Sequence, residues 1–87
     1  MITIVDYCLN RAVEAKTTTE AAFWIVLGQE VEARPDLRAV QCPDVEQAHA
    51  KAMVLVNSLD PVPFANKAMA EVKTLFVCDR IVKRTCL

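Results

Sequence analysis

Apolar side chains recur along the chain with helical spacing, and short breaks marked by threonine or proline separate these stretches. From Val5 to Val13 they return at intervals of three and four residues, the spacing of one face of an α-helix. Thr3 precedes this stripe with Asp6 three positions later, an arrangement close to an N-terminal capping box. We therefore expect a first helix over residues 3–16.

A second helix is expected from the capping box formed by Thr17 and Glu20 to about residue 33. It must end before Pro35, because the proline ring disfavours the helical conformation of the residue before it. Residues 21–27 are apolar without interruption. A helix that is apolar on every side must be buried on every side. Because a few short helices can hardly surround it, we expect one side to meet another chain.

Three further elements follow. Pro35 begins a short helical turn, and a third helix is expected over residues 43–59. The prolines at 61 and 63 form a rigid connector, and the second of them can start a fourth helix over residues 63–84. The residues expected to face inward in this last helix are Ala65, Ala68, Met69, Val72, Leu75 and Phe76.

These elements predict a single all-α domain over residues 1–87, a small bundle of three to four helices plus the short turn. A single glycine and the absence of Asn-Gly or Asp-Gly turns both favour helices over hairpins. The alternative is an α+β fold, in which the β-branched stretches 2–5 and 74–77 pair as short terminal strands.

Composition adds an expectation of association. The chain is 54% hydrophobic and has a mass of 9.7 kDa. A folded protein of this size exposes about 5,100 Å² and buries about 64% of the surface of its unfolded chain. The apolar content exceeds what this modest interior needs, so we expect part of it to form a surface for a partner, and the domain to be a homo-oligomer.

Two stretches are candidates for that surface. The first lies in the second helix, and the other lies on a second apolar stripe near the end of the fourth helix. Large aromatic side chains dominate cores and interfaces alike, so the aromatic pair of the second helix fits the bundle core equally well. The candidate interface residues are Phe23, Trp24, Leu27, Val77 and Ile81.

Charge is balanced overall, at a net −1, but uneven along the chain. Residues 20–46 carry six acidic and two basic side chains, and residues 63–87 carry five basic and two acidic ones. We interpret this as mutual neutralisation, across the fold or between subunits. The alternative is that a basic face of the fourth helix contacts nucleic-acid phosphates or an acidic partner. That face would consist of Lys73, Arg80, Lys83 and Arg84.

The sequence offers no catalytic, metal or cofactor site. His49 is the only histidine, and although Glu46 precedes it by three positions, a di-iron bundle needs two such pairs. The four cysteines form no C-x-x-C pair, so zinc and redox signatures are absent, and Cys8 and Cys78 are expected in the core. Gly28 stands alone, which excludes glycine-rich phosphate loops; a close helix crossing explains it better.

The expected function is a non-enzymatic protein–protein interaction module, such as a small regulator, adaptor or inhibitor. Its partner would be another protein or a second copy of itself. The alternatives are a nucleic-acid-associated regulator and a small-ligand-binding bundle with a pocket between subunits. The N-terminus lacks the features of a signal peptide, and the longest apolar run is seven residues. We therefore expect no membrane association and a cytoplasmic location.

Overall fold

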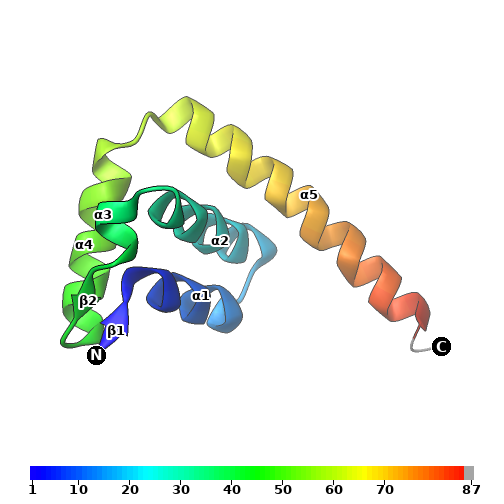
Figure 1. Cartoon of the computed structure of the whole chain (residues 1–87). Coiled ribbons are helices and arrows are strands. Elements are labelled where there is room, and N and C mark those ends of the chain that lie inside the picture. Colours follow the sequence, from blue (N-terminus) through cyan, green and yellow to red (C-terminus); the bar gives the residue numbers. More distant parts are fainter. Residues whose placement is uncertain (86–87) are drawn as a thin grey trace.

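Helices make up 79% of the chain, as predicted for a small all-α domain (Figure 1). The computed structural model describes the backbone of residues 1–85 and the side chains of residues 1–75. The elements, in chain order, are β1 (Ile2–Thr3), α1 (Ile4–Glu14), α2 (Thr18–Glu32), α3 (Pro35–Arg38), β2 (Gln41–Cys42), α4 (Val45–Ser58) and α5 (Pro61–Thr85).

Side-chain caps fix where three of the helices begin. The hydroxyl oxygen of Thr3 accepts a hydrogen bond from the backbone N–H of Asp6 at 3.1 Å, and Thr17 accepts from Glu20 at the same distance. These bonds satisfy backbone donors that the first turn of a helix leaves free. Asp44 caps α4 in the same way, so this helix begins at Val45, two residues later than expected.

A minimal antiparallel sheet joins the N-terminus to the segment before α4. In its register, Ile2 pairs with Cys42 and Thr3 pairs with Gln41. The alternative α+β arrangement is wrong in its second strand, because residues 74–77 lie within α5. Residues 2–3 do form a strand, but their partner is the chain that follows α3.

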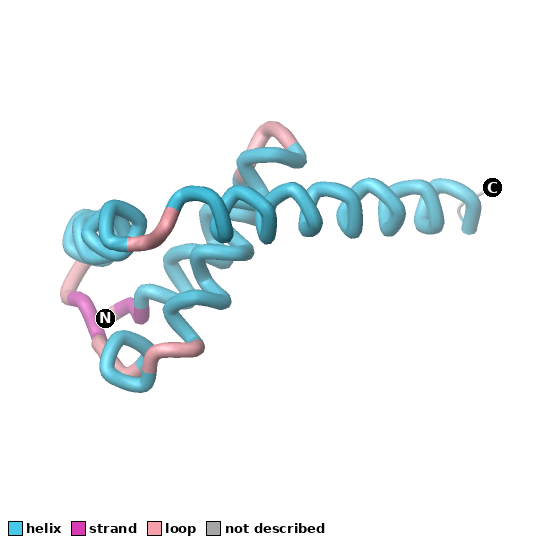
Figure 2. Tube along the Cα trace, turned by 90° about the horizontal axis from the view of Figure 1, so that it is seen from above, coloured by secondary structure: helices cyan, strands magenta, loops and turns pink. Residues whose placement is uncertain are grey.

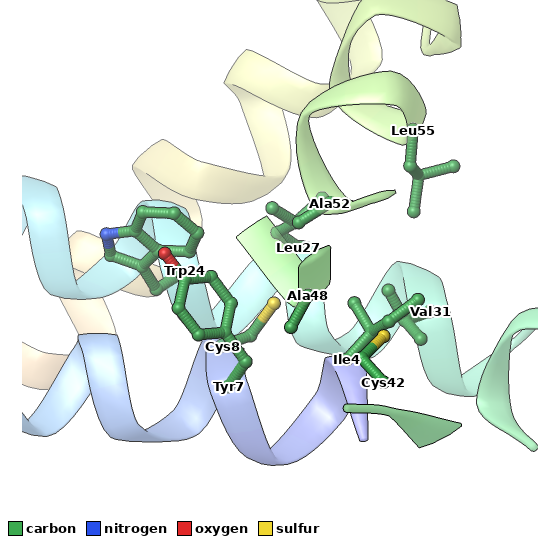
Figure 3. Packing of buried hydrophobic residues seen from close by; sticks show 10 residues of the cluster. All are labelled: Ile4, Tyr7, Cys8, Trp24, Leu27, Val31, Cys42, Ala48, Ala52 and Leu55. Carbon is green, nitrogen blue, oxygen red and sulfur yellow. The ribbon is translucent and has the colours of Figure 1, made fainter. Parts of the chain in front are cut away.

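The core forms around α2, which packs against α1 on one side and α5 on another. Figure 3 shows side chains from α1, α2 and α4 meeting in this core. The chain's own helices therefore cover most of the apolar run that was expected to require another chain. The buried cluster consists of Ile4, Tyr7, Cys8, Trp24, Leu27, Val31, Cys42, Ala48, Ala52 and Leu55.

The inward face of α1 differs from the predicted stripe. Ile4, Tyr7 and Cys8 are buried, whereas Leu9 is 47% exposed and Val13 is 86% exposed. The strand pairing just before Ile4 and the contacts with α2 and α4 set the rotation of this helix. A sequence stripe cannot encode these tertiary contacts.

Gly28 lies where α1 and α2 come close together, as expected. A Cβ atom added at Gly28 would lie 3.4 Å from the Cβ of Cys8, at the near limit of ordinary van der Waals contact. A methyl group at this position would therefore already touch the side chain of Cys8 on the neighbouring helix. The glycine therefore allows this close packing and has no role in a phosphate loop.

The second half of α5 extends beyond the other helices (Figure 1). In Figure 1 this orange-to-red half extends well past α1, α2 and α4, and Figure 2 shows the same extension toward the C-terminus from a second direction. The radius of gyration is 14.0 Å, compared with about 12 Å for a compact domain of this length. The accessible surface is 6090 Å², about 1,000 Å² more than a compact monomer of this mass exposes.

Candidate functional site

The first half of α5 is attached to α2 by one aromatic contact and one ion-pair group. The rings of Phe64 and Phe23 lie edge to face with centroids 5.5 Å apart. Next to them, Lys67 Nζ lies 2.6 Å from one carboxylate oxygen of Glu30, and Arg34 Nη1 lies 2.9 Å from the other. The hydrogen bond from Lys67, followed by that from Arg34, holds the pKa of Glu30 below its usual value. These contacts fix which face of α5 points toward the core.

The outer face of α5 is apolar and uncovered by the chain's own helices. Val62 is 66% exposed and Met69 is 64% exposed, and Ala65 between them is also exposed. A spacing of three to four residues places these three side chains on one side of a helix. The prediction that Ala65 and Met69 face inward is therefore wrong. We call Val62, Ala65 and Met69 the outer face of α5.

The sequence did contain a signal for the correct face. Reading the stripe from Phe64, the only aromatic residue in the first turns of α5, gives Phe64, Ala68 and Leu75, all of which are partly buried. The predicted stripe was right for Ala68, Val72 and Leu75, but it began at Ala65 instead of Phe64 and therefore included two exposed residues, while Phe76 lies outside the described side chains. A large aromatic side chain buries far more apolar area than alanine, so its position decides the rotation.

Most of the predicted charged and apolar contacts near the C-terminus lie outside the described side chains. These are Val77 and Ile81 of the candidate interface, and Arg80, Lys83 and Arg84 of the candidate basic face. Cys78 lies there too. Lys73 is described and exposed. Contact of this basic face with nucleic acid stays a prediction.

The aromatic pair of α2 belongs mainly to the chain's own core. Leu27 is fully buried and Trp24 is 5% exposed, while Phe23 is partly buried. The Trp24 indole packs against the Tyr7 ring at a centroid distance of 5.7 Å and lies under the Arg11 guanidinium at 5.4 Å. Of the two interpretations that the sequence left open, the bundle core therefore holds for Trp24 and Leu27. They cannot form a surface in the folded chain.

His49 is exposed, but its ring lies against the rings of Tyr7 and Trp24 at the edge of the core. Its Nδ1 atom lies 2.6 Å from the Tyr7 hydroxyl, which donates to it when the imidazole carries its proton on Nε2. Burial raises the pKa of Tyr7, although nearby Arg11 opposes this effect, so the phenol keeps its proton. The bond joins α1 to α4. Among the described residues, no group of three or more His, Cys, Asp or Glu side chains could hold a metal ion.

Both described cysteines are buried and free. Burial raises the pKa of Cys8 from 9.0 to about 11, so at neutral pH the thiol is protonated and is a poor nucleophile. The prediction that Cys8 acts as a small core hydrophobe is confirmed, and Cys42 joins it in the same cluster.

Stability at alkaline pH should depend on Cys8. The folded chain holds the thiol proton between about pH 9 and about pH 11, where the unfolded chain releases it. Stability therefore falls as pH rises through this range, by about 2 kcal/mol at about pH 10.5. Urea unfolding at several pH values should show this loss in the natural chain and a smaller loss in Cys8→Ala. Parallel profiles for the two proteins would contradict the assignment.

A second apolar feature lies between α3 and α4. Leu37, Ala50, Lys51 and Val54 line an open hollow of about 290 Å³. Among the described side chains that line it, Lys51 alone is charged, and small-molecule sites are usually larger and more enclosed. Val54 at its edge is 69% exposed. The hollow offers one apolar wall on α4, away from the outer face of α5.

The chain matches no protein-family model, no curated protein and no solved structure. In the part of the chain that the structure describes, none of the helices combines the length and apolar character needed to span a bilayer. Function must therefore be inferred from the side chains themselves.

Proposed function

We propose that the protein is a non-enzymatic protein–protein interaction module that binds its partner through the outer face of α5. One observation carries the proposal: a helix anchored on one side presents Val62 and Met69, each more than 60% exposed, on the other side. Exposed apolar side chains that share a helix face are typical of helix-mediated recognition. Roles as an adaptor, regulator or inhibitor all use such a surface.

The way α5 is held supports this proposal. Phe64 and the ion pair between Lys67 and Glu30 fix the first turns of the helix on α2, so the outer face has a defined orientation before any partner binds. A surface that is already ordered loses less conformational entropy on binding. The excess exposed area of about 1,000 Å² is also comparable to the roughly 800 Å² that each partner buries in a standard interface.

The titratable side chains of the core fit a structural role better than a catalytic one. The hydroxyl of Tyr7 is engaged with His49, and the thiol of Cys8 is buried and protonated at neutral pH. The free thiols of Cys8 and Cys42 also suit a reducing compartment, so a cytoplasmic location is part of the proposal.

A photo-crosslinking amino acid at position 69 tests the proposal, with position 13 as its matched control. Met69 lies on the outer face of α5 at 64% exposure, whereas Val13 is an even more accessible apolar residue on α1, at 86% exposure. In cells that express the protein, irradiation should give a discrete protein adduct from position 69 and none from position 13. Equal labelling from both positions, or none from position 69, would exclude this face as a binding surface.

A further inference from the structure

We propose that the partner of the outer face of α5 is a second copy of the same chain, in a two-fold symmetric dimer whose α5 helices run antiparallel. This inference rests on the proposed function, because it names the occupant of the same surface. Three observations support it: the distribution of charge, the exposed area and the direction in which α5 leaves the body of the protein.

Charge divides the chain into an acidic body and a basic extension. Residues 1–72 contain ten acidic and six basic side chains, a net charge of −4. Residues 73–87 contain four basic side chains and one acidic side chain, a net charge of +3. Because the second half of α5 leads away from the body, these opposite charges are separated within one chain (Figure 1). A second copy brings them together.

Part of the acidic charge of the body is already neutralised within the chain. Lys67 and Arg34 use both carboxylate oxygens of Glu30. In contrast, Asp60, which directly precedes α5, is exposed and appears in no ion pair among the described residues; its carboxylate accepts only the capping hydrogen bond from the Val62 N–H. A basic extension from another copy would therefore meet an acidic group at the start of α5.

The direction of α5 selects an antiparallel pair. In a parallel pair, the two extensions of +3 would lie side by side and repel each other, and the two acidic bodies would share one end. In an antiparallel pair, each extension runs back along the first half of the partner's α5. The positive end of each α5 dipole then lies beside the negative end of the other, which is electrostatically favourable. The two contacts are identical by symmetry.

This arrangement also covers the apolar surface that the monomer exposes. The extension of one copy would lie over Val62 and Met69 of the other. In the sequence of that extension, Phe76 follows Met69 by seven residues, the spacing that keeps an apolar residue on the same side of a helix. The contact occurs twice, so the excess area of about 1,000 Å² per chain is enough for a dimer of standard size.

Sedimentation equilibrium on the full chain tests the dimer. The natural chain should sediment as two copies of 9.7 kDa at micromolar concentration. Met69→Lys places a further positive charge where the basic extension would lie, and should raise the dimer dissociation constant by at least about 30-fold. Val54→Lys, at a site of 69% exposure on α4, makes the same change elsewhere and should leave the constant within about 3-fold. Circular dichroism checks that both variants fold.

The outcomes separate this inference from the proposed function. A natural chain that stays monomeric at all concentrations overturns the dimer, and so does dissociation caused by Val54→Lys but not by Met69→Lys. If position 69 then still crosslinks in cells to a protein of different mass, the interaction module stands and its partner is another protein. If position 69 gives no adduct at all, both proposals fail.

Discussion

Replacing Trp24 with alanine should reduce the free energy of unfolding by about 3–5 kcal/mol, the usual cost of truncating a buried indole. The ring is 5% exposed and contacts Tyr7, Phe23 and the Arg11 guanidinium. A domain of this length has a total stability of about 4–13 kcal/mol, so the variant should be marginally folded at best. Urea unfolding followed by circular dichroism measures the change.

Val13→Ala is the control for this prediction, because it removes an apolar side chain that is 86% exposed. Its effect should stay within about 0.5 kcal/mol. A loss below about 1 kcal/mol for Trp24→Ala would mean that the indole does not lie at the centre of the core. The prediction has a practical consequence: a Trp24 variant that loses a partner reports unfolding, so it cannot test an interface.

Reversing two charges on the basic extension should have the second large effect. Arg80→Glu with Arg84→Glu changes the net charge of residues 73–87 from +3 to −1. The extension would then repel the acidic body of a second copy, and the dimer dissociation constant should rise by about 100-fold at low salt. Sedimentation at increasing ionic strength should reduce the difference between this variant and the natural chain, because salt screens exposed charges.

The same variant separates the dimer from the nucleic-acid alternative. If the basic face binds phosphates, the natural chain should bind DNA or RNA with an affinity that falls steeply with salt, and the variant should lose this binding. Arg38→Glu is the control, because it reverses an exposed basic side chain on α3, far along the chain from residues 73–87. A dimer that is equally sensitive to both changes would indicate a general charge effect rather than contact by the extension.

Local signals in the sequence were sufficient for most helix boundaries. The capping boxes at Thr3 and Thr17 and the proline at position 35 act through backbone groups within one turn, so they can be recognised without knowledge of the fold. The beginning of α5 shows the limit of such signals. The Asp60 carboxylate accepts a hydrogen bond from the Val62 N–H at 3.2 Å, and the helix includes Pro61, two residues before the expected start.

The rotation of the helices and the pairing of the strands were harder to predict. Apolar residues in α1 and α5 occupy more than one face, so periodicity alone could not decide whether Leu9 or Tyr7, or Met69 or Phe64, points inward. The pairing of residues 2–3 with residues 41–42 spans about forty residues and involves two residues in each strand, too few to form a pattern. In each case the decision depends on a contact with another element.

The candidate site could likewise be predicted only as far as local signals allow, because contacts between elements decide which apolar residues are exposed. An excess of apolar residues suggested a surface for a partner, which stays a prediction, and the sequence placed part of that surface on Trp24 and Leu27, which are buried in the core. The exposed residues that the structure adds are Val62 and Met69. Their exposure follows from the anchoring of α5 by Phe64 and Lys67, a long-range contact with α2.

Amide hydrogen exchange at two protein concentrations tests the central claim most directly, because it reports which part of α5 a second copy covers. We expect protection of residues 73–85 to rise between low and high micromolar concentration, together with protection of the helix around Met69. Protection of the buried α2 around Leu27 should not change over the same range. Exchange rates in α5 that are independent of concentration, in a chain that remains folded, would contradict the claim that its outer face is an interface between copies.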